Sequence, residues 1–438
     1  MSPRSLARRY AGLTGLRWFP IGLTIPVLVL LMQARGLDLA QTGRILALYG
    51  LVVIALELPT GGLADTVGRR PVLAVSSLVS AAGLVVMAIA PSAALMALAA
   101  TLLGTGRALG SGPLEAWYVD LVRADDSSAD IGTGIARAQA MEGLSLGVGA
   151  LVGGALPALA AQAVPGVFSP DSVIIAMSVP FLVASVFLLV HAGAVLVLVT
   201  ETRGDARGSE GGGRASVTGT VTAGLSVVAR SRDLRRLVGY AAILGVTLGG
   251  VELVSPGAFE RLLGGPEQAG ATYGVLVGLG FAAAALGAVL APRLARHFPS
   301  PRAAAFTLGM VAVPLAVMVG LPQLAVASGA FVGFYLVLGA QGPLLAGLLH
   351  DRVDAGQRST VLSVESLAAS LGGVGASLVI GGLVAATTVL VGLAMVGAAL
   401  VAGALMIRGV HDAPVTRTQP QSTPDNISTD AVRGSENR

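Results

Sequence analysis

One short stretch decides how this chain is organised: Gly61-Gly62-Leu63-Ala64-Asp65-Thr66-Val67-Gly68-Arg69-Arg70-Pro71-Val72-Leu73. It holds two adjacent glycines, one acid and two adjacent arginines, whereas long apolar runs lie on both sides of it. Arginine is costly in the hydrocarbon of a bilayer and gathers in cytoplasmic loops. The stretch therefore predicts a tight cytoplasmic turn between two membrane-spanning helices.

The composition of the whole chain also indicates a protein whose solvent is the bilayer. Of its 438 residues, 54% are hydrophobic and 12% are charged, and its mean hydropathy is +0.80, whereas a soluble protein is about 25% charged. The absence of cysteine excludes disulfides and cysteine-based metal sites. The net charge of +4 does not indicate nucleic acid, because the arginines flank apolar segments and no aromatic-basic patch accompanies them.

Apolar windows long enough to cross the membrane recur along the chain. About 30 Å of hydrocarbon takes roughly 20 helical residues. Twelve such windows lie near residues 14–34, 40–61, 72–91, 95–119, 136–161, 173–199, 235–256, 270–291, 303–320, 323–347, 360–384 and 387–407. We therefore expect an all-α integral membrane protein with twelve transmembrane helices in two pseudo-symmetric six-helix bundles.

Composition and charge also predict the domains and the topology. We expect an N-terminal bundle, a linker rich in Gly, Ser, Thr and charge, a C-terminal bundle and a disordered cytoplasmic tail, at residues 1–200, 201–232, 233–408 and 409–438. Arginines gather in alternate connections between the windows, with Arg35 and Arg261 as exceptions. Cytoplasmic loops carry such an excess. We therefore expect a multi-pass protein of the cell membrane with both termini in the cytoplasm.

The opening stretch resembles, position by position, the G-x-L-A-D-R-x-G-R-K-x-x-L signature of major facilitator superfamily transporters, with Thr66 as the one clear departure. The resemblance implies that this turn latches onto the start of helix eleven, here Arg358-Ser359-Thr360, when the carrier opens outward. Asp65 can face the positive end of a neighbouring helix, and we expect Asp120 to pair with Arg69. The predicted conformational latch comprises Gly61, Asp65, Gly68, Arg69, Arg70, Asp120 and Arg358. The alternative is an arginine pair that only sets topology.

Helix four carries polar residues inside an apolar window. Arg107, Ser111 and Glu115 recur at four-residue steps and so share one helix face, apart from any kink at Pro113. The segment resembles the family motif R-x-x-x-G-x-G with one residue fewer before the first glycine, and the arginine of that motif is implicated in proton transfer. We expect a polar stripe that faces a cavity. The alternative is an arginine held by backbone carbonyls for packing.

Several acids lie inside predicted spans and are candidates for proton coupling. Glu57 and Glu115 rank first. Glu57 lies one turn inside the membrane from the opening stretch, where desolvation favours a neutral carboxyl. Glu115 belongs to the polar stripe of helix four. The further candidates are Glu142, Glu252 and Glu365. Glu252 lies near the outer end of its helix, where it can also reach water. A structural role stays open for each of these acids beside a coupling role.

Helix five holds a glycine-rich segment, residues 145–154, that resembles the G-x-x-x-G-P-x-x-G-G motif of the antiporter branch of the superfamily. Ala150 replaces the proline of that motif, and close helix packing by small residues is an equal interpretation. No spacing typical of a catalytic triad, a zinc helix or a phosphate loop occurs. We therefore expect no enzyme activity, no cofactor and no metal site.

These patterns predict a secondary active transporter that exports a small, largely apolar drug or metabolite by proton-coupled alternating access. One alternative is uptake of a nutrient or ion by a symporter or facilitator of the same fold. Another is a membrane receptor or scaffold that transports nothing. We expect a monomer whose partners are the small-molecule substrate, protons and the lipid bilayer, with no nucleic acid among them.

Overall fold

The computed structural model describes residues 3–125, 130–168, 172–200, 225–353 and 357–411. Every regular element within these ranges is helical. Twelve spans in the described residues are long and apolar enough to cross a membrane. The prediction of an all-α protein with twelve transmembrane helices is confirmed.

The first six spans are made of α1 (Pro3–Thr24), α2 (Leu28–Ala34), α3 (Leu39–Val67), α4 (Arg69–Ile89), α5 (Ala93–Leu109), α6 (Pro113–Asp125), α7 (Gly132–Ala163), the 3-10 turn η1 (Ala176–Ser178) and α8 (Val179–Leu198). The second six are α10 (Arg232–Leu263), α11 (Pro266–Ala295), α12 (Pro301–Met318), α13 (Leu324–His350), α14 (Arg358–Ala386) and α15 (Val389–Arg408). A short helical segment at 225–230 precedes α10. The first span is interrupted between α1 and α2, and the fourth between α5 and α6.

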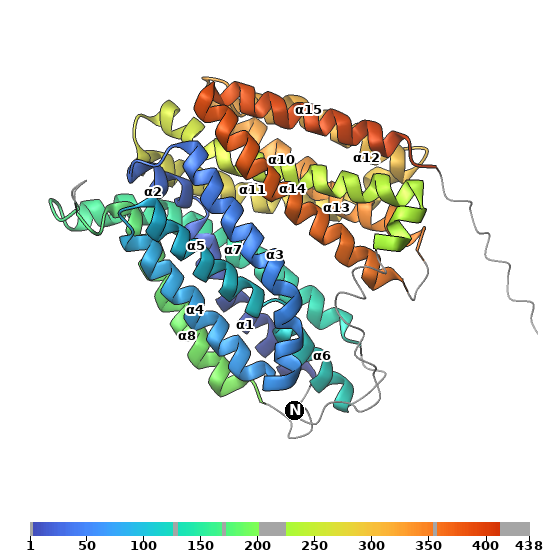
Figure 1. Cartoon of the computed structure of the whole chain (residues 1–438), viewed down its shortest axis with the longest axis horizontal. Coiled ribbons are helices and arrows are strands. Elements are labelled where there is room, and N and C mark those ends of the chain that lie inside the picture. Colours follow the sequence, from blue (N-terminus) through green and yellow to red (C-terminus); the bar gives the residue numbers. More distant parts are fainter. Residues whose placement is uncertain (1–2, 126–129, 169–171, 201–224, 354–356, 412–438) are drawn as a thin grey trace, which may run out of the picture.

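The spans form two six-helix bundles, one from each half of the chain (Figure 1). The packing pattern repeats: α1 packs on α7 and α8 as α10 packs on α14 and α15, and α4 packs on α5 and α8 as α12 packs on α13 and α15. Between the bundles, α3 packs on α14 and α7 on α11. The two halves are therefore pseudo-symmetric, as the sequence predicts.

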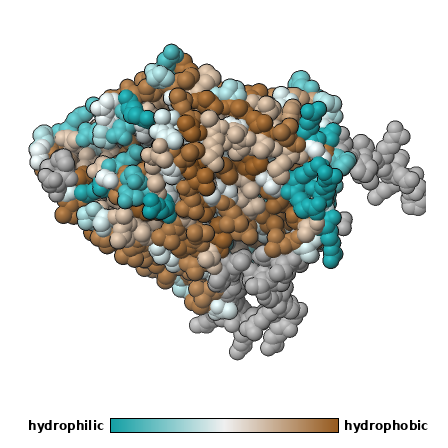
Figure 2. Space-filling model, turned by 45° about the horizontal axis from the view of Figure 1, so that its top comes forward, coloured by the Kyte–Doolittle hydropathy of each residue, from teal (hydrophilic) through white to brown (hydrophobic). Residues whose placement is uncertain are grey.

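The outside of the protein has the surface of a membrane protein. Figure 2 shows an apolar belt across the molecule, with hydrophilic residues gathered toward its two edges. Large apolar side chains such as Leu144, Val186 and Val289 are exposed on the helices of both bundles. Exposure of such large apolar side chains is favourable when lipid, rather than water, contacts them.

The bundles meet at one end of the molecule and diverge toward the other (Figure 1). We call the end where α1 begins, α8 ends and α10 begins the linker end, and the opposite end the far end. A Cβ atom at Gly43, near the far end of α3, would collide with the carbonyl oxygen of Ser377 on α14. One at Gly154, in the far half of α7, would collide with the carbonyl oxygen of Gly270 on α11. Glycines thus let the two bundles touch backbone to backbone at the far end.

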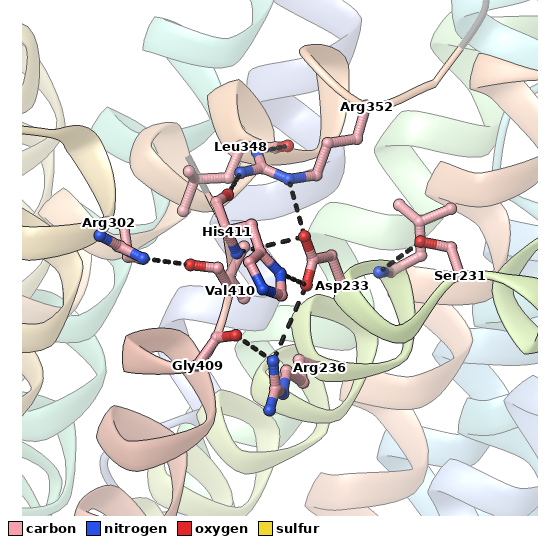
Figure 3. A network of polar contacts seen from close by, with 10 residues as sticks. Ser231, Asp233, Arg236, Arg302, Leu348, Arg352, Gly409, Val410 and His411 are labelled. Atoms are coloured by element: carbon pink, nitrogen blue, oxygen red, sulfur yellow. Dashed lines mark hydrogen bonds and ion pairs between the residues drawn. The ribbon is translucent and has the colours of Figure 1, made fainter. Parts of the chain in front are cut away.

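At the linker end, a polar network holds the chain that follows α15 (Figure 3). Asp233, in the first turn of α10, accepts a hydrogen bond from the backbone N–H of His411 at 3.2 Å and lies 3.2 Å from His411 Nδ1. The network, which we call the C-terminal clamp, also includes three arginines that donate to backbone carbonyls: Arg236 to Gly409, Arg302 to Val410 and Arg352 to His411. The clamp fixes residues 409–411, the start of the predicted tail, and residues 412–438 lie outside the described part of the chain.

Replacement of Asp233 by alanine is expected to loosen the clamp. Its carboxylate lies 3.8 Å from Arg236 and 4.0 Å from Arg352, so the variant leaves two guanidinium groups without their shared acid. Loss of a charged hydrogen-bond partner costs about 1–3 kcal/mol. We expect the midpoint of thermal denaturation in detergent to fall by a few degrees. Asp233→Asn keeps an acceptor for the His411 N–H and is expected to fall less, whereas equal midpoints for Asp233→Ala and the wild type would contradict the role of the clamp.

Candidate functional site

A cavity lies between the two bundles and has two adjoining parts. The inner pocket, about 290 Å³, is lined almost entirely by the N-terminal bundle. The interface pocket, about 470 Å³, has walls from both bundles. Both are lined by Ile25, Leu28, Leu46, Tyr49, Arg107 and Glu252. Together they are large enough for a small molecule, because ligand pockets measure roughly 300–1,000 Å³.

The walls of the two pockets differ in polarity. Apolar side chains such as Leu84, Met87 and Phe181 dominate the inner pocket. The interface pocket adds the hydroxyl groups of Ser366, Ser370 and Ser377 from one face of α14, and that of Ser111 from the break between α5 and α6. The cavity therefore offers an apolar recess that opens into a more polar region between the bundles.

Arg17, on α1, is a charged residue of the inner pocket that the sequence analysis missed. Its side chain lines the pocket, although only 6% of the residue is exposed. Nη1 donates to Ser76 Oγ at 3.1 Å, and Nη2 donates to the carbonyl oxygen of Gly106 at 3.5 Å. A Cβ atom at Gly110 would collide with the guanidinium, so glycine there leaves room for it. The signal that identifies Arg17 is a lone arginine inside the first apolar window.

Arg107 lies in the last turn of α5 and lines both pockets. Its guanidinium carbon lies 4.5 Å from the ring centroid of Trp18, a cation–π contact with α1.

The predicted polar stripe of Arg107, Ser111 and Glu115 is only partly right. The helix breaks after Leu109, with Gly112 at φ 91°, a conformation that suits glycine.

The break separates the members of the stripe. Arg107 and Ser111 both line the interface pocket. Glu115 instead begins α6, is exposed to solvent and interacts with the hydroxyl of Tyr10 on α1. The prediction of one continuous polar face through Glu115 is therefore wrong, because α5 ends before it.

The five candidate acids lie in different surroundings. Glu252 lines both pockets, and the Tyr335 hydroxyl donates to its Oε1 at 3.1 Å. Glu57 lines the interface pocket but is exposed in this conformation, contrary to the burial expected for its side chain. Glu142 on α7 and Glu365 on α14 are partly buried and line neither pocket. Glu252, rather than Glu57 or Glu115, is the acid at the centre of the cavity.

The described part of the predicted latch lies within the N-terminal bundle. Arg69 forms an ion pair with Asp120, so the contact expected between α4 and α6 is present. Gly68 takes φ 105° at the turn between α3 and α4. Arg70 donates to the carbonyl oxygen of Leu196 on α8. The surroundings of Gly61 and the side chains of Asp65 and Arg358 lie outside the described part of the structure, and the latch to the start of α14 stays a prediction.

Comparison with known proteins agrees with this architecture. Residues 11–377 match the model of the Major Facilitator Superfamily. The chain belongs to that superfamily. It is a multi-pass membrane protein, and its family indicates a transporter of a small molecule rather than an enzyme. No curated protein matches the sequence.

Solved transporters share the fold of this superfamily member. The nucleoside transporter NupG is 12% identical, with a TM-score of 0.75 over 92% of this chain and 98% of that one. A bacterial homologue of the human lysosomal transporter Spinster, solved in an inward-facing conformation, is 16% identical, with a TM-score of 0.68 over 93% and 95%. The human organic anion transporter MFSD10 is 16% identical, with a TM-score of 0.61 over 93% and 100%. Identities this low show the fold alone.

Proposed function

We propose that this superfamily member exports a small, largely apolar compound across the cell membrane by proton-coupled alternating access. One observation carries the proposal. The cavity between the bundles combines apolar walls with a carboxyl group, Glu252, that is bonded to a neutral phenol rather than to a cation. Such a carboxyl can take up or release a proton without breaking an ion pair.

The distribution of arginine supports a cytoplasmic linker end. The backbone contacts at Gly43 and Gly154 then close the outer end of the molecule, and the bundles diverge toward the cytoplasm. With the linker end in the cytoplasm, this conformation corresponds to the inward-open state of the proposed cycle. In the outward-open state, the bundles would separate at these glycines and approach one another at the linker end, where the predicted latch of Asp65 and Arg358 would engage.

A second candidate function is uptake of a polar nutrient by symport. The hydroxyl groups on the α14 face of the interface pocket favour it, because Ser366, Ser370 and Ser377 can bind a polar solute. The same fold supports both directions of transport. A receptor or scaffold role has no comparable observation in its favour.

Everted membrane vesicles test the proposal, because their outer face is the cytoplasmic face. A panel of labelled apolar compounds and polar nutrients is offered with the vesicle interior made acidic, and again without a pH difference. We expect an apolar member of the panel to accumulate only with the acidic interior, and an ionophore that equalises pH to abolish the accumulation. Equal accumulation without the gradient would contradict coupling. Accumulation driven only by the opposite gradient would instead establish symport.

A further inference from the structure

We propose that the inner pocket binds the anionic group of an amphiphilic compound between Arg17 and Arg107, so that the substrate class is a small organic anion with an apolar body. The assignment of this compound as transported cargo rests on the proposed function, whereas its binding does not. This inference adds one anionic group to the small, largely apolar compound of the proposed function.

The charges of the inner pocket are unbalanced. Two guanidinium groups line it, and neither forms an ion pair with a carboxylate in the described part of the chain. Arg17 donates to a serine hydroxyl and a backbone carbonyl, and Arg107 stacks on Trp18. Glu252 lines the same pocket, but its described hydrogen bond is to Tyr335. Glu142, which interacts electrostatically with Arg107, lines neither pocket. Arginine keeps its charge in proteins, so the two guanidinium groups of the pocket lining outnumber its one carboxyl group, Glu252.

Burial makes this imbalance costly. Arg17 is almost completely buried, and the walls around it are mostly apolar. A buried charge without a counterion is strongly destabilising, and a bound anion relieves that cost. The guanidinium also has more N–H donors than its two described contacts use. A carboxylate or sulfonate accepts from such donors in a bidentate manner.

The rest of the ligand follows from the size and the walls of the pocket. Its volume of about 290 Å³ and its lining by Ile21, Leu188 and Phe181 suit a short alkyl chain or an aromatic ring. Glu252 disfavours a second negative group on the ligand, because like charges repel in an apolar site. The pocket therefore selects a single anionic group attached to an apolar body.

Tryptophan fluorescence tests binding directly. The chain has two tryptophans, and Trp18 touches Arg107, so Trp117→Phe leaves a reporter at the site. The protein is placed in phosphatidylcholine nanodiscs and titrated with 4-phenylbutyrate, 4-phenylbutanol and 4-phenylbutylamine, which share one apolar body. We expect the carboxylate to bind at least about tenfold more tightly than the other two. Equal affinities, or tightest binding of the amine, would overturn the proposal.

Variants then assign the site. Arg17→Gln is expected to weaken 4-phenylbutyrate at least about tenfold and to leave 4-phenylbutanol unchanged. Arg44→Gln, a substitution of an exposed arginine on α3 outside both pockets, is the matched control. If Arg17→Gln fails to fold, Arg107→Gln in the same background is expected to give the same selective loss. Retention of full carboxylate affinity in a folded variant would refute the assignment.

Two further experiments make two distinctions. The first distinguishes a soluble anion from a lipid phosphate, and the second distinguishes the anion site from the proposed transport function. Adding phosphatidylglycerol to the nanodiscs is expected to leave 4-phenylbutyrate binding unchanged. Loss of binding would mean that a lipid phosphate occupies the pocket. That result would contradict the proposal that the pocket binds a soluble organic anion. Selective binding without gradient-driven transport of the same compound would reject the proposed function and uphold the anion site.

Discussion

Replacement of Gly154 by alanine is expected to lower transport at least about tenfold, because it prevents the two bundles from closing at the far end. The new methyl group would collide with the carbonyl oxygen of Gly270 and lie 2.7 Å from Gly274 Cα. Both are backbone atoms of α11, so relief requires the helices to move apart. Overpacking of this kind costs about 1–3 kcal/mol, enough to shift a two-state equilibrium by roughly tenfold.

Cysteine labelling can measure this shift, because the chain contains no cysteine of its own. A single cysteine at Ser370, on the exposed face of α14 in the interface pocket, is labelled with a maleimide from outside everted vesicles. We expect Gly154→Ala to slow labelling, because fewer molecules are open at the linker end. Gly143→Ala on the same helix is the control, since a Cβ atom there meets nothing within 4 Å. Equal labelling rates for the two variants would refute the closure.

Replacement of Glu252 by glutamine is expected to reduce proton-driven accumulation more than about tenfold while exchange of substrate at equal pH continues. The amide keeps the shape of the side chain and an oxygen that can accept from the Tyr335 hydroxyl, but it cannot carry a proton at this position. The variant therefore distinguishes the loss of proton coupling from the loss of substrate passage. Accumulation in everted vesicles with an acidic interior measures the first, and counterflow without a pH difference measures the second.

Two comparisons make the result for Glu252 specific. Glu260→Gln changes another acid of α10 that lines neither pocket and is expected to keep full coupling. Glu57→Gln and Glu115→Gln change the acids that rank first from the sequence, and their exposure predicts smaller losses. Loss of coupling in either of them, with Glu252→Gln unaffected, would restore the ranking made from the sequence.

Features that depend on local sequence could be predicted well. The spans follow from the length and hydropathy of each window. The pairing of Arg69 with Asp120 follows from two opposite charges, one at the start of α4 and one in α6. The break in the fourth span was harder to locate. Pro113 and the glycines before it were visible, but the sequence did not indicate that α5 ends at Leu109 and leaves Glu115 outside the cavity.

The sequence by itself determined the solvent of this protein, its twelve spans, its two halves and its family, because hydropathy and the opening motif are carried by short segments. Only the tertiary structure decided which polar groups face the cavity. Helices in lipid are apolar on their outer and inner faces alike, so periodicity does not reveal how each is rotated. Arg17, Arg107 and Glu252 come from three separate spans, and they line one pocket only once those helices have packed.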